Sequence, residues 1–115
     1  MKFTDTLKLN YEFHRLYSKG KSAVTPFLVV YARRSRHPGN RIGFTVSNKI
    51  GHAVVRNRIR RRLREVYRLH EEDFLRGTDL VIVARARAAA ATYRQLEKAL
   101  LSACGNLGVY SERTE

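Results

Sequence analysis

The chain has 115 residues, and 43% of them are apolar, which is enough for one domain with a hydrophobic core and excludes a disordered basic tail. Lysine and arginine number 23 against 10 acids, and the net charge of +13 predicts a polyanionic partner that would relieve the self-repulsion. Cys104 is the only cysteine, so an intrachain disulfide and a thiolate zinc cluster are excluded. With no apolar leader and no uncharged run near ~20 residues, we expect a soluble, cytoplasmic protein that does not enter a membrane.

The first predicted element is a helix that follows a polar, loosely ordered segment at residues 1–8. Asn10 can cap its start, and Gly20 stops it. One stripe at helical spacing holds Leu9, Phe13, Leu16 and Tyr17. The stripe can be core, or Phe13 and Tyr17, one turn apart, can stay partly exposed and stack on bases.

Two strands are predicted next, joined by a basic turn. The first covers residues 22–34, with an apolar run at residues 27–32 and with Pro26 at an edge or a bulge, because proline cannot donate to a ladder. A solvated hairpin tip is the simplest interpretation of the charges in the turn, which belong to Arg33, Arg34, Arg36 and His37. The second strand, residues 41–47, alternates apolar and polar positions and is therefore half-buried.

A long basic helix is predicted from about residue 53 to about residue 76, after a short connector at residues 49–51. At ~100° per residue, one side is apolar and holds Val55, Ile59, Leu63, Val66, His70 and Phe74. The opposite side is basic and holds Arg58, Arg61, Arg64 and Arg68, with Arg60 and Arg62 on the flanks and Arg56 at the entrance. Residues 49–68 carry eight basic side chains, seven of them arginine, and one acid, for a local charge of +7.

The last predicted elements are a buried strand at residues 80–84, after a turn at residues 78–79, and a third helix. Thr92 and Gln95 form a capping box that opens this helix. Because a helix lies between two strands, residues 41–47 and 80–84 are expected to pair in parallel through a βαβ crossover.

The sequence lacks a recognisable constellation for catalysis. The four histidines do not have metal-ligand spacing, and the adjacent acids Glu71, Glu72 and Asp73 splay around a helix, as expected of a solvated helix end. A protein-only nuclease would need convergent carboxylates or a histidine pair. We therefore expect no catalytic residue in this chain, and the sequence assigns no metal site.

The basic side of the long helix favours nucleic acid over its alternatives. A solvated face would mix charge signs, and a membrane-surface helix would have a broader aromatic and leucine side. Arginine also binds phosphate oxygens with two donors at once. Because the charges continue for about four turns, and no helix-turn-helix precedes them, folded RNA is a better match than the DNA major groove.

Several segments resemble the bacterial ribonuclease P protein family. The run Arg56-Asn57-Arg58-Ile59-Arg60-Arg61 resembles the family's RNR signature. The family's first helix and turn, its strand-to-loop segment and its strand after the long helix resemble YEFHRLYSKGKS, IGFTVSNKIG and DLVIVAR. The similarity spans about residues 7–105, in the same order and spacing.

This resemblance implies one α+β domain over residues 1–115, in the order α-β-β-β-α-β-α, with a central sheet of about four strands. It also implies an unusual left-handed βαβ crossover, where the general rule predicts a right-handed one. One strand is then missing from the elements above, and a short one near Lys49 would supply it. In the family, a catalytic RNA removes the 5′ leader of precursor tRNA with magnesium ions bound mainly by RNA. The protein would be a subunit of this endonuclease and would bind both the ribonuclease P RNA and the leader.

The resemblance also assigns site residues by position. The RNA-binding set in the RNR region is Lys49, Arg56, Asn57, Arg58, Arg60, Arg61, Arg64 and Arg68. The leader cleft, between the first helix and the sheet, would be lined by Phe13, Tyr17, Tyr31, Ser47 and Arg85. Two residues depart from the family: Asn48, where a second lysine is frequent, and Arg62, where an apolar residue is common.

Two other functions are alternatives at this point. One is a structural RNA-binding protein, such as a ribosomal or RNA-chaperone component, without a role in cleavage. The other is a DNA-binding protein, which the residues favour less, so no DNA partner is expected. Affinity for tRNA with and without a 5′ extension separates the first alternative from the cleavage role.

Overall fold

The computed structural model describes residues 1–111 of the chain. Within them, the three helices are α1 (Asn10–Lys19), α2 (Ala53–His70) and α3 (Tyr93–Asn106). One sheet contains the strands β1 (Thr4–Thr6), β2 (Lys21–Val24), β3 (Leu28–Arg34), β4 (Asn40–Thr45) and β5 (Thr78–Ala84). Short 3-10 turns are η1 (Asn48–Ile50), η2 (Glu71–Asp73) and η3 (Ala86–Ala90).

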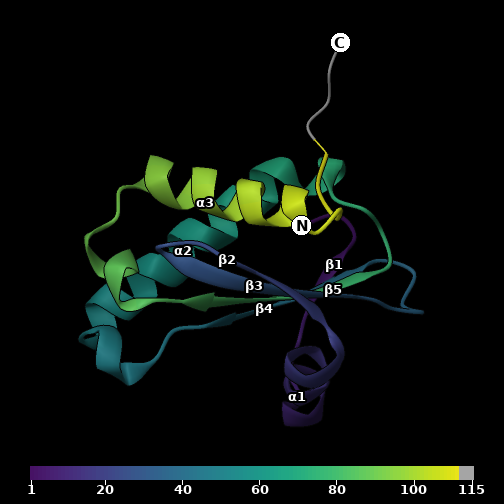
Figure 1. The fold of residues 1–115 in the computed structure, drawn as a ribbon, viewed down its shortest axis with the longest axis horizontal. Helices are drawn as coiled ribbons and strands as arrows, with labels where there is room; N and C mark the ends of the chain where they lie inside the picture. Colours follow the sequence, from purple (N-terminus) through teal and green to yellow (C-terminus); the bar gives the residue numbers. More distant parts are fainter. Residues whose placement is uncertain (112–115) are drawn as a thin grey trace.

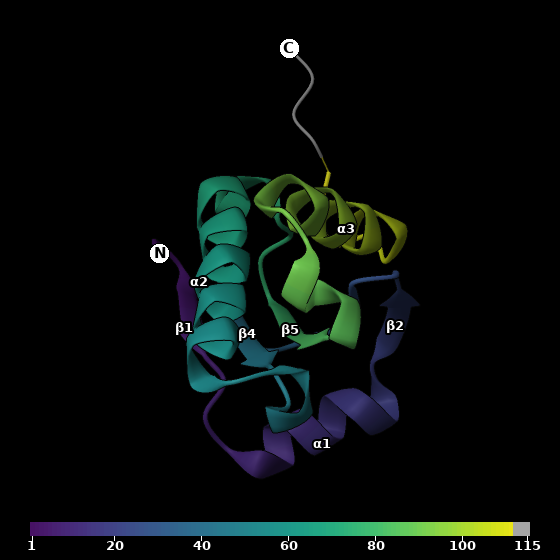
Figure 2. The ribbon, with the colours of Figure 1, turned by 90° about the vertical axis from the view of Figure 1, so that its left-hand side faces the viewer.

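The sheet is mixed, with the strand order β1-β4-β5-β3-β2. β4 pairs in parallel with β1 and β5, whereas β3 is antiparallel to β5 and β2. α2 and α3 cover one face of the sheet, and α1 covers the other (Figure 1). In Figure 2, β4 and β5 point toward the viewer below α2, and β5 lies to the right of β4, so the βαβ crossover is left-handed. The α+β class, the parallel pairing and the unusual crossover are thus confirmed, with five strands instead of about four.

The sequence prediction missed two strands, β1 and β2, and neither lies near Lys49, where the chain forms η1 instead. Residues 22–34 read as one strand because both halves are apolar, but a turn divides them at Thr25. The Thr25 hydroxyl accepts hydrogen bonds from the backbone N–H of Phe27 at 3.2 Å and of Leu28 at 3.0 Å. This side chain satisfies the backbone of a tight turn, and Pro26 sits inside it. The result is an antiparallel hairpin with β2 at the edge of the sheet.

Residues 1–8 are not loosely ordered as predicted, because a buried carboxylate holds them. Glu71 is 3% exposed and accepts hydrogen bonds from the backbone N–H groups of Lys2 at 2.8 Å and Phe3 at 3.2 Å. The Thr4 hydroxyl donates to the same carboxylate at 2.5 Å, so its oxygen must accept from the Tyr67 hydroxyl at 2.7 Å. These bonds place β1 beside β4. The prediction that Glu71 belongs to a solvated helix end is therefore wrong.

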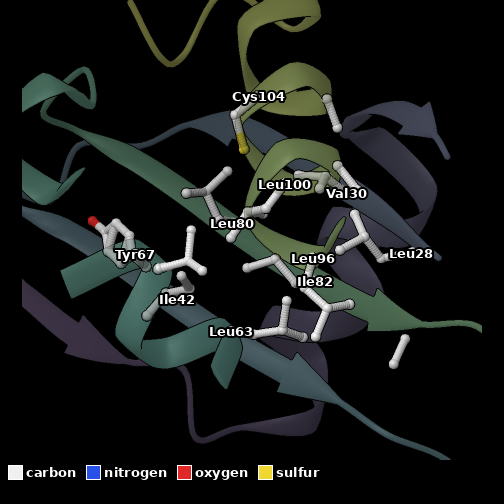
Figure 3. Close-up of a cluster of buried hydrophobic side chains, with 14 of the residues drawn as sticks. Leu28, Val30, Ile42, Leu63, Tyr67, Leu80, Ile82, Leu96, Leu100 and Cys104 are labelled. Atoms are coloured by element: carbon white, nitrogen blue, oxygen red, sulfur yellow. The ribbon is translucent and has the colours of Figure 1, made fainter. Parts of the chain in front are cut away.

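The main core lies between the sheet and the pair α2 and α3 (Figure 3). Alternate residues of the strands form the sheet side of this core. The helix side is formed by Ile59, Leu63, Tyr67, Leu96 and Leu100. Each fully buried aliphatic side chain contributes about 1.5–3 kcal/mol through burial. A second, smaller cluster lies under α1 and contains Leu7, Leu16 and Val81, with Phe13, Tyr31 and Val83 packed against it.

Three predicted boundaries shift in the structure. α2 ends at His70, not near residue 76, and the buried Phe74 therefore lies outside the helix. Residues 78–79 belong to β5 instead of a turn, because Asp79 pairs with Arg41 across the sheet. α1 begins at Asn10, but Leu9 is its N-cap, and the Glu12 carboxylate accepts from the Leu9 backbone N–H at 3.1 Å. The capping box of α3 is confirmed, with Thr92 and Gln95 bonding each other's backbone at 3.1 and 2.9 Å.

Candidate nucleic-acid interface

The outward face of α2 carries exposed side chains at helical spacing, opposite the buried stripe. Its members are Val54, Asn57, Arg61, Arg64 and Arg68. The Arg64 guanidinium lies 5.9 Å from the centre of the Phe44 ring, within reach of a cation–π contact. Arg68 donates to both oxygens of Glu65, at 2.5 and 3.0 Å, and this hydrogen bonding lowers the pKa of Glu65. Arg61 and Arg64 are therefore the cations of α2 most open to a phosphate.

On one flank of α2, arginine side chains are hydrogen-bonded to the backbone of the segment before α3. Arg58 donates to the Ala89 carbonyl at 3.1 Å, and Arg62 donates to the Ala91 carbonyl at 3.0 Å. Both arginines are half-buried, so the prediction that Arg58 belongs to the open face is wrong. The reason is that η3 and the residue after it lie beside this flank, where a long guanidinium can reach their backbone carbonyls. Arg62, which departs from the family pattern, thus connects two elements.

The other flank of α2 faces η1. The Arg56 guanidinium donates to the Asn48 side-chain oxygen at 2.5 Å, and Arg60 donates to that of Asn57 at 3.2 Å and to the Val46 carbonyl at 3.5 Å. The Arg56 Nε atom is shielded from solvent and has no hydrogen-bond partner among residues 1–111. Asn48, which departs from the pattern that the family resemblance implies, orients Arg56. Lys49 is exposed beside it in η1.

The predicted cleft residues lie on the sheet face that α1 covers. We define the aromatic face as Tyr17, Tyr31, Thr45 and Val83. The rings of Tyr17 and Tyr31 meet edge to face, with centres 5.0 Å apart, and the Tyr17 hydroxyl is 3.3 Å from the Thr45 hydroxyl. Tyr17 is 39% exposed, so part of its side chain is accessible to a base. Sequence reasoning missed Thr45, although it falls on the polar side of the alternating strand.

Phe13 behaves as a core residue instead of an open platform. It is half-buried and packs against the small cluster under α1, directly on the backbone of Gly43. The core interpretation of the α1 stripe therefore applies to Phe13, and the exposed interpretation applies to Tyr17, one turn later. Phe13 anchors the helix to the sheet, and Tyr17 stays accessible.

Ser47 and Arg85 lie at the ends of the strands beside this face. The Ser47 hydroxyl accepts from the Lys49 backbone N–H at 3.2 Å and begins η1. Arg85 follows β5 and donates to the Thr25 carbonyl at 2.8 Å, so its exposed guanidinium is held against the β2–β3 turn. Both residues border the aromatic face without joining it.

The aromatic face and the start of α2 lie at the same end of the sheet. β4 carries Thr45 into the aromatic face, and two residues later Ser47 opens η1, which leads to α2. α1 and η1 both project below the sheet in Figure 1, with the ends of β4 and β5 between them. A polyanion on α2 could therefore continue onto the aromatic face.

The side chains of residues 1–111 give little support for a catalytic nucleophile or a metal site. Burial raises the pKa of the Cys104 thiol to about 12, so it stays protonated near neutral pH. Among residues 1–111, no three histidine, cysteine or acidic side chains gather where they could hold a metal ion. In the same part of the chain, every helix is too short or too polar to cross a membrane.

Comparison with known proteins decides the family. The family model described as Ribonuclease P matches residues 1–108. This chain belongs to the ribonuclease P protein family. The ribonuclease P protein component of Alkaliphilus metalliredigens is 41% identical over 101 residues, covering 88% of this chain and 91% of that protein. The component from Clostridium botulinum is 39% identical over 106 residues, covering 91% and 96%.

Solved structures of the family have the same fold. The ribonuclease P protein of Staphylococcus aureus superimposes with a TM-score of 0.85 at 33% identity, covering 92% of this chain and 97% of that one. The protein from Thermotoga maritima gives a TM-score of 0.77 at 26% identity, covering 85% and 93%. The chain is thus a protein subunit of an endoribonuclease, and the alternative of a structural RNA-binding protein without a role in cleavage is not favoured.

Proposed function

We propose that this chain binds the catalytic RNA of ribonuclease P through α2 and the 5′ leader of precursor tRNA through the aromatic face. The RNA then cleaves the leader in the cytoplasm, and the protein increases the affinity for the substrate. One observation carries the proposal: the aromatic face continues through Thr45 and Ser47 into η1 and α2. Two surfaces suited to RNA therefore meet at one end of the sheet.

The α2 surface suits the backbone of folded RNA. Arg61 and Arg64 present exposed guanidinium groups one turn apart, and Lys49 adds a third cation from η1. Arginine donors pair with phosphate oxygens two at a time, so several phosphates could be held along the helix.

The aromatic face suits a flexible single strand. A leader has unpaired bases, and such bases can stack on an exposed aromatic ring. Tyr17 offers this ring, and Tyr31 supports it from the sheet at 5.0 Å. The Thr45 hydroxyl, held 3.3 Å from the Tyr17 hydroxyl, adds a polar group beside the ring.

Magnesium chemistry is assigned to the RNA in this proposal. The side chains of residues 1–111 do not form a cluster fit to hold a divalent ion, so no step is attributed to a metal on the protein. The protein contributes cations that screen the repulsion between two RNA molecules. Its effect should therefore be greatest where magnesium is scarce.

Reconstitution tests the proposal. The full chain is added to a bacterial ribonuclease P RNA at low magnesium concentration, and cleavage of a precursor tRNA is measured. We expect faster cleavage with the wild-type chain and a smaller effect with Arg61→Gln/Arg64→Gln. A wild-type chain that leaves cleavage unchanged would refute the proposal. Equal affinity for tRNA with and without a leader would favour a structural RNA-binding role.

A further inference from the structure

A second basic surface lies around the β3–β4 turn, residues 35–39. We define the distal basic surface by its six cations: Arg15, Lys19, Lys21, Arg33, Arg34 and Arg36. All are exposed except Arg33, which is half-buried. Two hollows open between them. One of about 650 Å³ lies beside Arg15, Arg33, Arg34 and Arg36, and one of about 220 Å³ lies between Lys19, Lys21, Arg33 and Arg34.

In the described part of the chain, only Arg15 of the six cations of the distal basic surface has an electrostatic interaction with a nearby acid, Glu12, whose pKa it helps to lower. Arg41 binds both oxygens of Asp79, at 2.9 and 2.7 Å, and binds Glu12 at 2.6 Å, so these carboxylates are engaged. Asp5 lies 3.3 Å from the His37 ring. Among residues 1–111, none of the six cations forms a side-chain hydrogen bond or an ion pair, and Arg15 alone contacts a ring, that of Tyr11, at 5.7 Å.

This pattern differs from that of α2. There, Arg58 and Arg62 bind backbone carbonyls, and Arg68 is paired with Glu65. The distal basic surface thus has more uncommitted cations than the helix with the highest local charge. A solvated hairpin tip would gain from interspersed acids, because clustered like charges repel each other. An anionic ligand would relieve this repulsion.

The distal basic surface is separate from the α2 surface. β4 begins at the 35–39 turn and ends toward η1 and α2, and its six residues span about 20 Å. In Figure 1, the turn lies at the right end of the sheet, and η1 lies at the left end. α1, which carries Arg15 and Lys19 of the distal basic surface, crosses the sheet between these two ends.

We propose that the distal basic surface binds the phosphate backbone of a single-stranded RNA segment. The smaller hollow favours a single strand, because its lining combines apolar side chains, those of Leu75, Leu107 and Val109, with four cations. An unstacked base can contact the apolar side chains while its phosphates meet the cations, whereas a duplex hides its bases in the stack. This inference goes beyond the proposed function, since it requires neither the leader nor the catalytic RNA.

The test measures binding of a labelled, unstructured 20-nucleotide RNA to the full chain by fluorescence anisotropy between 50 and 200 mM salt. Arg34→Gln/Arg36→Gln removes two exposed charges from the distal basic surface, and Arg94→Gln/Lys98→Gln removes two exposed charges from α3 as a matched control. If Arg34 and Arg36 each contact one phosphate, the slope of log affinity against log salt falls by about 1.4. Affinity at 100 mM salt then falls about 25-fold. The control should change neither value by more than a small fraction of this.

Equal losses of RNA affinity in the two double variants would overturn the proposal, because they would reflect the change in net charge alone. A second measurement locates the RNA. In Arg61→Gln/Arg64→Gln, a hexanucleotide should still shift the backbone amide NMR signals of residues 33–37, and the absence of such shifts would also overturn it. Neither assay contains catalytic RNA, so the binding and NMR results can be interpreted even if reconstitution of cleavage fails.

Discussion

The Phe13 ring on α1 lies directly on the backbone of Gly43 on β4. A Cβ atom at position 43 would stand 2.6 Å from Phe13 Cε1 and 2.7 Å from Cζ, too close for any real contact. Gly43→Ala should therefore push the ring and α1 away from the sheet. Overpacking of this kind costs about 1–3 kcal/mol of unfolding free energy. Urea unfolding measures the loss.

Gly105→Ala is the matched control for that substitution. Gly105 lies in α3, where the nearest atom to an added Cβ is 3.9 Å away. Alanine is also the better helix former, so this variant should be as stable as the wild type or up to about 1 kcal/mol more stable. A Gly43→Ala variant that matches the control would show that α1 adapts without strain.

Arg61 and Arg62 are adjacent in sequence but should respond oppositely to alanine. Arg61 is exposed on the outward face, so Arg61→Ala should weaken binding of ribonuclease P RNA and change the unfolding free energy by less than about 0.5 kcal/mol. Arg62 binds the Ala91 carbonyl at 3.0 Å, so Arg62→Ala should cost about 1–2 kcal/mol of stability. Filter binding and urea unfolding of both variants test the division. Equal RNA affinities for the two variants would contradict it.

Tyr17 should recognise the leader, and Tyr11 provides its control. Both tyrosines are exposed on α1, but only Tyr17 packs against Tyr31 in the aromatic face. If a leader base stacks on it, Tyr17→Ala should weaken binding of leader-bearing precursor by about 1–3 kcal/mol and leave mature tRNA binding unchanged. Tyr11→Ala should affect neither ligand specifically. Equal losses for precursor and mature tRNA in Tyr17→Ala would place the tyrosine outside the leader site.

Local sequence patterns predicted the elements whose signals lie within a few residues. The capping box of Thr92 and Gln95, the alternation around Phe44 and the buried stripe of Ile59, Leu63 and Val66 all depend on neighbours along the chain. β1 could not be predicted in this way. Its three residues are polar, and the carboxylate that holds them belongs to Glu71, 67 residues away from Thr4.

The handedness of the crossover came from family resemblance, because the general rule gives the opposite hand. In the candidate site, too, one part could be predicted from the sequence and another part could not. The charge of α2 is visible in the sequence, but the helical wheel could not show that Arg58 and Arg62 bind carbonyls near η3. Likewise, Phe13 and Tyr17 share one stripe, and only the position of Gly43 under Phe13 separates their roles.

Glu71 should make the stability of the fold sensitive to acid. Burial alone would raise its pKa, but the hydrogen bonds from Thr4 and from the backbone of Lys2 and Phe3 outweigh burial and hold the pKa of Glu71 below its usual value. Since the folded state holds this proton less tightly than the unfolded state, its stabilisation is complete above the unfolded value of about 4.5. It is then lost as the pH falls through the lower, folded pKa.

Glu71→Gln tests this linkage. An amide leaves some of the three donors unpaired, so the variant should lose about 1–3 kcal/mol at pH 7. Its stability should also fall less steeply than that of the wild type below pH ~4.5, because the titrating group is gone. Urea unfolding from pH 7 to pH 3 measures both effects. Glu72→Gln removes the same charge from an exposed neighbour that pairs with Lys2 at 2.6 Å, and it should change stability by less than about 0.5 kcal/mol. Parallel acid profiles for Glu71→Gln and the wild type would mean that another group controls acid unfolding.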